Sequence, residues 1–281
     1  MSGFLHELVG CMSQGAAGNP SGVMVEAAFA RQDLPWRYIN MEVAPENLAT
    51  AIRGAHAMGF RGFNLSMPHK VAVIPLLDGL GESASLIGAV NCVVRRGDRF
   101  IGENTDGKGF LAALRSVQDP RGRNVVLFGA GGAARAIAVE VGLAGARSIT
   151  VVNRSEARGT ELATMLRDRA KLNARYEAWR GDYAVPADTD IVINGTSIGL
   201  YDADARLPIA LDSLRAGMVA ADVVFSPPET RFLREARARG CTTLDGLGML
   251  VQQGVIGIKY WTGVDPDPAV MRLALSKALE R

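Results

Sequence analysis

Cysteine is scarce in this sequence of 281 residues. The three cysteines, Cys11, Cys92 and Cys241, form no CxxC pair, and their number is odd. A framework of disulfide bonds or a zinc site built from cysteines is therefore not expected. Such a chain is typical of a reducing compartment, and we expect a cytoplasmic protein.

Metal-binding and nucleic-acid-binding patterns are also lacking. The three histidines, His6, His56 and His69, have no HExxH-like spacing, so we predict no metal site. The chain has 31 lysine and arginine residues against 29 aspartate and glutamate residues, which gives a net charge of +2, and no block of basic residues occurs. A dedicated nucleic-acid surface is therefore not expected.

A signal peptide is not expected from the sequence, and long apolar runs are lacking. The first 13 residues lack a basic stretch followed by an apolar one, so they do not resemble a signal peptide. The most apolar region, 125–146, is interrupted by Arg135 and Glu140, which disfavours a membrane span. A composition of 48% hydrophobic and 21% charged residues is that of a folded protein, and the length suits one large domain or two small ones.

From about residue 124, short β-branched runs alternate with helical stretches. Strands are expected at 125–128, 149–152, 174–177, 191–193, 219–225 and 242–244. Apolar strands with helices between them indicate a parallel sheet covered on both faces. This pattern predicts an α/β fold of the doubly wound, Rossmann type.

The first hundred residues form a different α/β region. A helix expected over 45–60 leads into a short strand over 61–67, where Asn64 and Ser66 alternate with apolar residues. The alternation places Asn64 and Ser66 on one face, which suits a strand lining a cleft. An ordinary half-exposed strand explains the pattern equally simply, and the pattern alone favours that interpretation. The segment 247–261 is expected to form a helix that packs on this region.

A glycine-rich loop follows the strand at 125–128. Residues 129–134, GAGGAA, match GxGxxA and open a predicted helix. In this context the glycines allow a tight turn and close approach of a pyrophosphate to the helix N-terminus. The sequence therefore predicts a dinucleotide site.

The end of the next strand indicates which dinucleotide is bound. NAD sites usually carry an acidic residue there, whereas this strand ends in Asn153, Arg154 and Ser155. Arg158 lies one helical turn beyond Arg154, so both guanidinium groups can face one anion. This favours the 2′-phosphate of NADP over NAD.

Seven motifs occur in an order that resembles the shikimate dehydrogenase family over almost the whole chain. They are NLSMPHK at 64–70, GAVN at 88–91, NTDG at 104–107, GAGGAA at 129–134, NRS at 153–155, NGTS at 194–197 and GMLVQQ at 248–253. The resemblance implies a substrate domain over 1–105, completed by helices over 246–281, and an NADP-binding Rossmann domain over 106–245. It also implies reversible oxidation of shikimate to 3-dehydroshikimate, a step of the shikimate pathway of aromatic amino acid biosynthesis.

The resemblance assigns roles to individual positions. Lys70 and Asp106 match the catalytic pair. Positions that match substrate contacts are Asn64, Ser66, Asn91 and Gln253. Positions that match cofactor contacts are Gly129, Ala130, Gly131, Gly132, Ala133, Asn153, Arg154, Ser155 and Arg158, with Thr196, Ser197 and Met249 near the nicotinamide.

The implied chemistry fits these residue types. When a hydride leaves a carbinol carbon, the hydroxyl proton must leave as well, and a neutral lysine amine can accept it. A nearby carboxylate favours the charged form of a lysine, so we expect Asp106 to orient the hydroxyl and the amine, or to share the proton. Which of the two groups is the base stays open.

The chain departs from the family pattern where the substrate carboxylate is held. The family carries Ser-x-Ser-Pro there, and alignment from Phe29 places Pro20 and Gly22 at the serine positions. Ser13, Ser21 or backbone N–H groups of this loop are the candidates to replace them. Phe225 stands where the family usually has a tyrosine, and Cys92 stands where it usually has a threonine.

A divergent substrate is one consequence of these changes. We expect a member that uses shikimate with altered affinity or prefers a relative, such as quinate or an amino or deoxy analogue. The ligand class is a polyhydroxylated cyclohexane or cyclohexene carboxylic acid, and neither nucleic acid nor membrane is expected as a partner. The sequence leaves open a monomer or a homodimer.

Two other functions compete with this interpretation. A non-catalytic module that senses NADP or a cyclic acid would need neither Lys70 nor Asp106, so their presence argues against it. A folate-type dehydrogenase with a similar cleft is disfavoured by the NTDG motif at 104–107.

Overall fold

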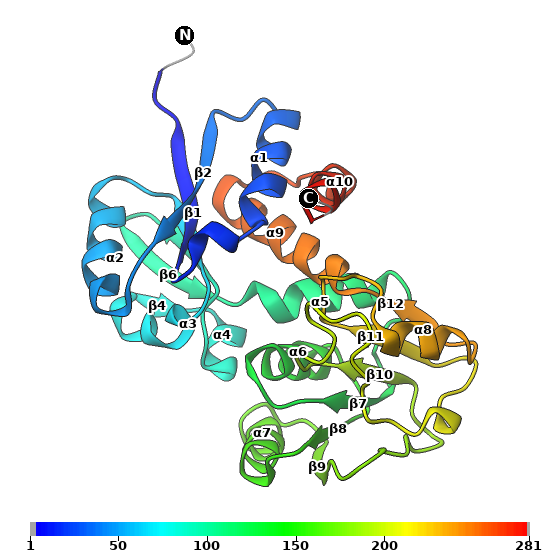
Figure 1. Ribbon diagram of the computed structural model, residues 1–281. Coiled ribbons are helices and arrows are strands. Elements are labelled where there is room, and N and C mark those ends of the chain that lie inside the picture. The colour runs from blue at the N-terminus through cyan, green and yellow to red at the C-terminus, as the bar shows by residue number, and fades with distance from the viewer. Residues whose placement is uncertain (1–3, 280–281) are drawn as a thin grey trace. The chain divides into compact units, whose positions relative to one another are not determined.

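The chain folds into two units, each with its own β-sheet (Figure 1). The computed structural model describes residues 4–279. The first unit holds the chain up to Thr105 and again from Gln253 onward, and the second runs from Asp106 to Gln252.

The return to the first unit falls inside helix α9 (Gly246–Thr262), whereas the sequence placed the boundary at 245 and 246. The start of α9 belongs to the second unit because it packs tightly there. A Cβ added to Gly246 would lie 2.2 Å from the backbone oxygen of Val224, and one added to Gly248 would lie 3.2 Å from the Cβ of Ala113. The glycines at the start of α9 therefore allow this close contact.

Six described strands form the mixed sheet of the first unit, in the order β2-β1-β3-β5-β6-β4. β1 pairs in parallel with β2 and β3, and β5 pairs antiparallel with β3 and β6. The strands are β1 (Glu7–Ser13), β2 (Trp36–Glu42), β3 (Gly62–Leu65), β4 (Gly79–Leu80), β5 (Cys92–Arg96) and β6 (Arg99–Glu103). The helices are α1 (Ser21–Arg31), α2 (Leu48–Ala57), α3 (His69–Ala72), α4 (Glu82–Ile87) and α10 (Pro268–Leu279), with 3-10 turns at Ala16–Gly18, Pro45–Asn47 and Ile74–Leu76.

The two faces of this sheet have different environments. Met12, Phe63 and Leu65 point to one face and form a core with Leu48 and Ile52 of α2. Side chains alternate along a strand, so the residues between them point to the opposite face.

That opposite face is more polar. Cys11 of β1 is the register partner of Asn64 in β3, and β2 places Tyr38 on the same side. Helix α9 covers this face, because the rings of Trp261 and Tyr38 lie 6.2 Å apart, centre to centre.

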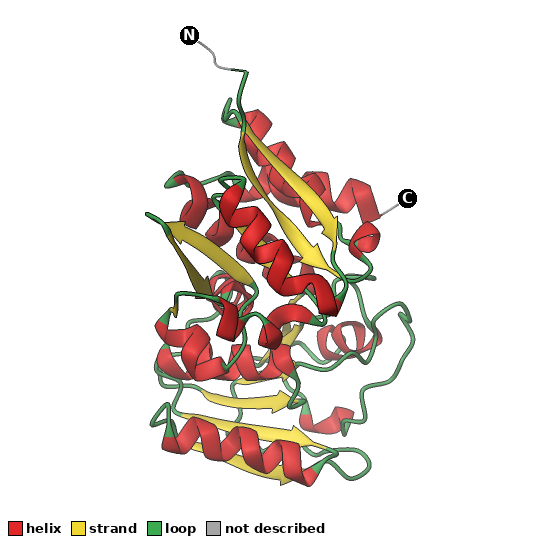
Figure 2. Ribbon diagram, turned by 90° about the vertical axis from the view of Figure 1, so that its left-hand side faces the viewer, coloured by secondary structure: helices red, strands yellow, loops and turns green. Residues whose placement is uncertain are grey.

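The second unit contains a parallel sheet of six described strands in the order β12-β11-β10-β7-β8-β9. With β7 as its first strand, this is the 3-2-1-4-5-6 order of dinucleotide-binding folds, and it confirms the predicted fold class. The strands are β7 (Asn124–Phe128), β8 (Ser148–Asn153), β9 (Ala174–Ala178), β10 (Ile191–Asn194), β11 (Val219–Asp222) and β12 (Thr242–Leu244). The helices are α5 (Thr105–Arg115), α6 (Gly132–Leu143), α7 (Glu156–Asp168) and α8 (Arg231–Arg237), with a 3-10 turn at Leu211–Ser213; helices flank the strands in both units (Figure 2).

One strand is shorter than the sequence predicts. β11 ends at Asp222, whereas a strand over 219–225 was expected. The Asp222 Oδ1 accepts a hydrogen bond from the Val224 N–H at 2.9 Å, which turns the chain out of the ladder. A local side-chain bond of this kind competes with strand pairing.

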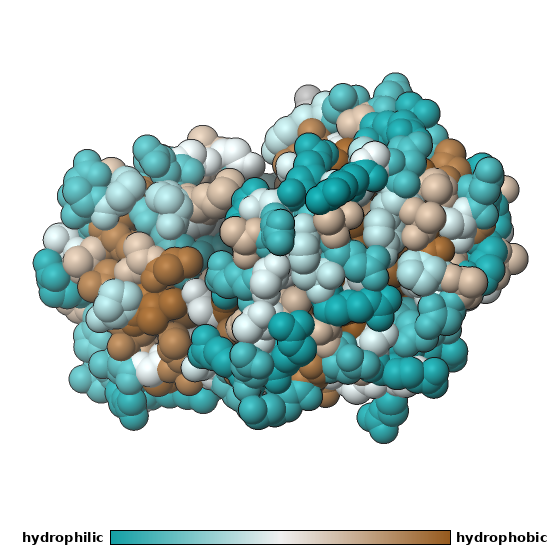
Figure 3. Space-filling view, turned by 90° about the horizontal axis from the view of Figure 1, so that it is seen from below, coloured by the Kyte–Doolittle hydropathy of each residue, from teal (hydrophilic) through white to brown (hydrophobic). Residues whose placement is uncertain are grey.

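The surface is mainly hydrophilic in the view of Figure 3, with one group of hydrophobic side chains toward its left-hand side. None of the described helices is both long and apolar enough to span a membrane.

Candidate active site

Lys70 lies in α3, shortly after the strand that carries Asn64. It is half-buried, and its backbone oxygen accepts a hydrogen bond from the Val90 N–H at 2.8 Å. The adjacent His69 is fully buried, with its Nε2 2.8 Å from the backbone oxygen of Val43. His69 therefore anchors α3, and Lys70 is the more accessible of the two side chains.

Asn91, the residue after Val90, fixes the start of α5. Its Oδ1 accepts a hydrogen bond from the Thr105 N–H at 2.6 Å, and its Nδ2 donates to Thr105 Oγ1 at 3.0 Å. The Thr105 hydroxyl in turn lies 3.4 Å from Gln253 Oε1. Asp106 follows Thr105 in the first turn of α5. Two consecutive residues, 90 and 91, thus hold the backbone of Lys70 and the residue before Asp106.

The amide of Asn64 is fixed at both ends. Its Oδ1 accepts a hydrogen bond from the Tyr38 hydroxyl at 2.9 Å, and its Nδ2 donates to the backbone oxygen of Asn91 at 3.1 Å. Burial raises the pKa of Tyr38 well above its usual value, so this hydroxyl keeps its proton and acts as the donor. The half-buried Asn64 can therefore offer a ligand a second N–H.

The three serines named from the sequence as substrate contacts differ in accessibility. Ser13, at the end of β1, is 3% exposed, and Ser21, at the start of α1, is 8% exposed. Ser66 is half-buried. Only Ser66 of these three presents an appreciable surface to a ligand.

The glycine loop of the second unit joins β7 to α6. Gly129 has a φ of +105°, and a Cβ there would lie 2.9 Å from the backbone oxygen of Gly195, so glycine is needed on both counts. A Cβ at Gly131 or Gly132 would meet nothing within 4 Å. The N-terminus of α6 therefore opens onto free space, where its N–H groups can receive a phosphate.

A cavity of about 340 Å³ lies at the carboxyl ends of β7, β8 and β10. Ligands of doubly wound folds bind where the strand order reverses, which here is between β7 and β10. The cavity is lined by Gly129, Ala130, Gly131, Asn153, Arg154, Arg158, Trp179, Gly195, Thr196, Ser197 and Ile198. Its position and lining fit a dinucleotide.

Two cations line this cavity, and none of its described lining residues is acidic. The Arg154 guanidinium lies over the ring of Trp179, 5.2 Å from the ring centre. Trp179 is itself fixed, because its Nε1 donates to the backbone oxygen of Pro208 at 2.8 Å and its ring lies 4.9 Å from that of Phe128. The arrangement favours a dinucleotide with an extra phosphate.

The loop after β10 is held by a buried polar cluster. Asn194 Oδ1 accepts from the Thr196 N–H at 3.1 Å and hydroxyl at 2.6 Å, and Asn194 Nδ2 donates to Asp222 at 3.0 Å. Asp222 also accepts from the Thr230 hydroxyl at 2.7 Å. Burial raises the pKa of Asp222 to about 6. This cluster sets the path of the loop that carries Thr196 and Ser197.

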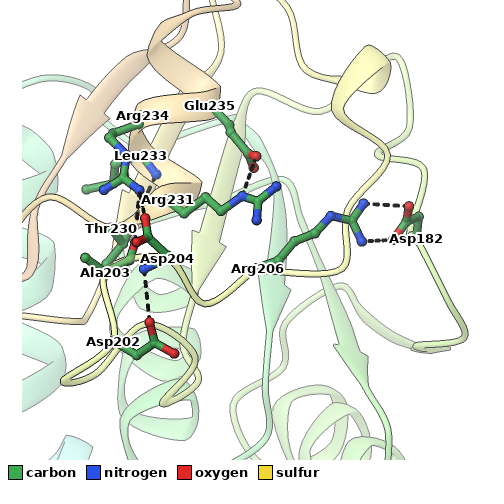
Figure 4. A network of polar contacts seen from close by, with 10 residues as sticks. All are labelled: Asp182, Asp202, Ala203, Asp204, Arg206, Thr230, Arg231, Leu233, Arg234 and Glu235. Carbon is green, nitrogen blue, oxygen red and sulfur yellow. Dashed lines mark hydrogen bonds and ion pairs between the residues drawn. The ribbon is translucent and has the colours of Figure 1, made fainter.

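Ion pairs hold the chain that continues from this loop (Figure 4). Arg234 Nη2 donates to Asp204 at 2.6 Å and to the backbone oxygen of Ala203 at 3.2 Å. Arg206 pairs with Asp182 through two bonds of 2.7 and 2.6 Å. The far end of the cavity-lining segment is therefore tied to α8 and to the chain after β9.

The cavity brings together most of the cofactor positions named from the sequence. Its lining omits Gly132 and Ala133, at the start of α6, Ser155, whose Oγ accepts from the N–H of Arg158 and caps α7, and Met249 of α9. Sequence reasoning missed Trp179 and Ile198, which belong to no motif.

A larger but shallower depression of 640 Å³ lies over α6 and α7. Two of its charged residues, Arg135 and Glu161, form an ion pair of 2.5 Å. It lies away from the glycine loop, so the smaller cavity is the better candidate. In the described part of the chain, no group of three or more His, Cys, Asp or Glu residues could hold a metal ion.

The strand order and the cavity define a dinucleotide-binding protein of the doubly wound class, with a second α/β unit. Three family descriptions match the chain. They are "Shikimate dehydrogenase substrate binding domain" over 17–93, "Shikimate / quinate 5-dehydrogenase" over 112–201 and "Shikimate 5'-dehydrogenase C-terminal domain" over 246–275. The chain belongs to the shikimate dehydrogenase family, as its motifs predicted.

Relatives match over nearly the whole chain. The shikimate dehydrogenase (NADP(+)) of Symbiobacterium thermophilum is 42% identical over 280 residues, which cover 97% of this chain and 95% of that protein. Among solved structures, shikimate 5-dehydrogenase from Thermus thermophilus with NADP(H) and shikimate is 34% identical, with a TM-score of 0.83 over 97% of this chain and 99% of that one. The ligand-free 5-ketofructose reductase of Gluconobacter sp. strain CHM43 is 52% identical, with a TM-score of 0.97 over 98% of this chain and 100% of that one.

Proposed function

We propose that this protein is an NADP-dependent oxidoreductase that interconverts a secondary alcohol and a ketone on a polyhydroxylated substrate, as between shikimate and 3-dehydroshikimate. The observation that carries the proposal is a pair of hydrogen bonds, from the Val90 N–H to the backbone oxygen of Lys70 and from the Thr105 N–H to the side-chain oxygen of Asn91. They fix Lys70 and the start of the helix that carries Asp106. A binding module has no need for such support of a lysine and an aspartate.

NADP, held by the glycine loop, Arg154 and Arg158, would supply the hydride acceptor for the alcohol and, as NADPH, the hydride donor for the ketone. Lys70 accepts the hydroxyl proton in the oxidative direction and gives it back in the reductive one. Asp106 orients the hydroxyl or shares the proton. Asn64 donates a hydrogen bond to a neighbouring substrate oxygen, with Ser66 as the second contact. Asn91 and Gln253, which are 3% and 6% exposed, instead support Thr105 at the start of α5.

NADP is the cofactor of this proposal. The Symbiobacterium relative carries NADP(+) in its name, and the Thermus structure contains NADP(H). In this chain, Arg154 and Arg158 would receive the 2′-phosphate, and the amides of the glycine loop and of α6 would receive the pyrophosphate. Thr196, Ser197 and Met249 would lie near the nicotinamide. Because NADP(H) is an intracellular cofactor, we place the activity in the cytoplasm.

Reduction of 5-ketofructose is a second candidate function. A specific observation favours it: the 5-ketofructose reductase is 52% identical to this chain, against 34% for the shikimate-bound Thermus enzyme. The expected absence of serine hydroxyls at Pro20 and Gly22 would fit the same substrate, because a sugar ketone has no carboxylate for them to hold.

A rate assay with purified protein tests the proposal. Reduction of NADP⁺ is followed with shikimate and with quinate, and oxidation of NADPH is followed with 5-ketofructose. Each assay is repeated with NAD⁺ or NADH, which lack the 2′-phosphate. We expect turnover with NADP(H) and at least one substrate. NADP binding without turnover of any substrate would instead support the sensing module.

A further inference from the structure

The loop between β1 and α1 lies beside the proposed substrate contacts. Its first residue, Gln14, donates its N–H to the backbone oxygen of Met67 at 3.2 Å, and the Ser66 N–H donates to Met12 at the same distance. The side chain of Asn19 reaches the Tyr38 hydroxyl, which donates to Asn64. A substrate held by Asn64 and Ser66 therefore lies next to this loop.

The loop already binds a carboxylate of the protein. The N–H groups of Gly15 and Ala16 donate to the two oxygens of Glu42, at 2.8 and 2.7 Å. Consecutive N–H groups in a glycine-rich loop are the usual backbone site for an anion. Here Glu42, the last residue of β2, fills that position.

Further amides of the loop are also used within the chain. Pro20 has no N–H to donate. The other bonds run from Gly18 N to Gly15 O, from Asn19 N to Ala16 O, from Ser21 N to Asn19 Oδ1 and from Val23 N to Pro20 O. Six of the eight N–H groups from Gly15 to Val23 are therefore already used within the chain, which leaves few to replace serine hydroxyls.

The loop also carries negative charge. Glu42 is exposed, and its hydrogen bonds from Gly15 and Ala16 lower the pKa of its carboxyl group. It is therefore ionised at neutral pH, and a substrate carboxylate at this loop would meet a like charge. Lys70 is reserved for the reacting oxygen in the proposed function.

We propose that the substrate group facing this loop is uncharged, so the enzyme prefers a polyhydroxy ketone without a carboxylate, such as a keto sugar. This inference rests on the proposed function and chooses between its two candidates. The reaction consumes one NADPH and one proton for each ketone reduced to a secondary alcohol. Hydroxyl groups of such a substrate can both accept from Asn64 and donate to exposed oxygens of Glu42.

The first test compares shikimate with its methyl ester, which has the same ring and no charge. With the full-length protein and NADP⁺, we expect kcat/KM for the ester to equal or exceed that for shikimate. With NADPH, we expect kcat/KM for 5-ketofructose to exceed that for 3-dehydroshikimate at least a hundredfold. A preference for shikimate over its ester of tenfold or more would overturn the inference and leave the proposed function intact.

Failure of the proposed function has a different signature. In that case no compound is turned over although NADP⁺ binds. Calorimetric titration of the NADP⁺-loaded protein with shikimate and with the ester then still decides the inference. Tighter binding of the ester supports the inference. Tighter binding of shikimate overturns it, and so does binding of quinate when neither shikimate nor the ester binds.

Two variants test the loop itself. Glu42→Gln removes the charge, and the double variant Pro20→Ser with Gly22→Ser supplies hydroxyl donors. For each we expect the shikimate-to-ester ratio of kcat/KM to rise at least fivefold. Glu46→Gln, which neutralises an exposed carboxylate four residues further on, is the control and should leave the ratio within twofold. An equal shift in Glu46→Gln and Glu42→Gln would overturn a specific role of the loop.

Discussion

The guanidinium group of Arg154 stacks on the indole ring of Trp179, 5.2 Å from the ring centre. Arg154 follows β8 and Trp179 follows β9, so the contact joins the ends of two neighbouring strands. A free arginine side chain loses rotamer freedom when it binds a phosphate. The stacked Arg154 has lost much of that freedom already, which favours binding of the 2′-phosphate.

Trp179→Ala should weaken binding of NADP⁺ about tenfold while changing binding of NAD⁺ less than twofold, because cation–π contacts contribute about 0.5 to 2 kcal/mol. Calorimetry with the two cofactors, or with adenosine 2′,5′-bisphosphate against AMP, measures this without catalysis. Trp179→Phe keeps an aromatic face and should retain most of the affinity. Equal losses for both cofactors would show that Trp179 only maintains packing.

Lys70→Ala should lower kcat by about two to four orders of magnitude, because it removes the group that exchanges a proton with the substrate oxygen. KM should change only a few-fold, since Asn64 and Ser66 still hold the substrate. Steady-state kinetics with the better substrate gives both constants. Lys277→Ala, at an exposed lysine of α10, is the matched control. Near-normal turnover in Lys70→Ala would remove this residue from its proposed role.

Local signals in the sequence predicted the sheet and the cofactor loop of the second unit. Alternating strands and helices predicted the parallel sheet, and the glycine loop at 129–134 located the cavity because the motif requires a strand before it and a helix after it. Arg154 and Arg158 were found because they lie at the end of the next predicted strand, one helical turn apart. Trp179 was missed, since no motif marks it and its contact with Arg154 depends on the pairing of β8 with β9.

Non-local pairing also limited what could be predicted for the first unit. The family resemblance assigned Asn64 to the substrate, but its partner Tyr38 lies on β2, two strands away across β1. The backbone N–H groups of the loop after β1 were candidate anion donors from sequence alone. Only the fold shows that Glu42, 26 residues beyond Ala16, already uses two of them.

Gly107→Ala should destabilise the protein by about 1 to 3 kcal/mol, because overpacking forces backbone shifts. A Cβ at Gly107 in α5 would lie 2.3 Å from the backbone oxygen of Ala136 in α6. The shift would also displace Asp106, so kcat should fall. Gly54→Ala in α2 is the control, since its Cβ would meet only the end of Met58 at 3.9 Å. That variant should be as stable as the parent or slightly more so, by thermal melting.

Asp222→Asn should remove one source of pH dependence in stability. Burial raises the pKa of Asp222 to about 6, above the ordinary value of 3.8. The folded protein therefore binds this proton between pH 4 and 6 more readily than the unfolded chain does, and the stabilisation is lost as pH rises through 6. Relative to the variant, the parent should lose up to about 3 kcal/mol between pH 4 and 7, measured by urea denaturation.

Asp182→Asn should have the opposite effect on the same measurement, which makes it the control. The hydrogen bond from Arg206 lowers the pKa of Asp182, so its contribution is present above the ordinary pKa and is lost as pH falls. The stability of the parent relative to Asp182→Asn should therefore rise with pH, although weakly, because the ion pair is exposed. The free energy of unfolding of the parent, relative to Asp222→Asn, should fall as pH rises. If it instead stays constant or rises, Asp222 is ionised throughout, because its three hydrogen-bond donors outweigh burial.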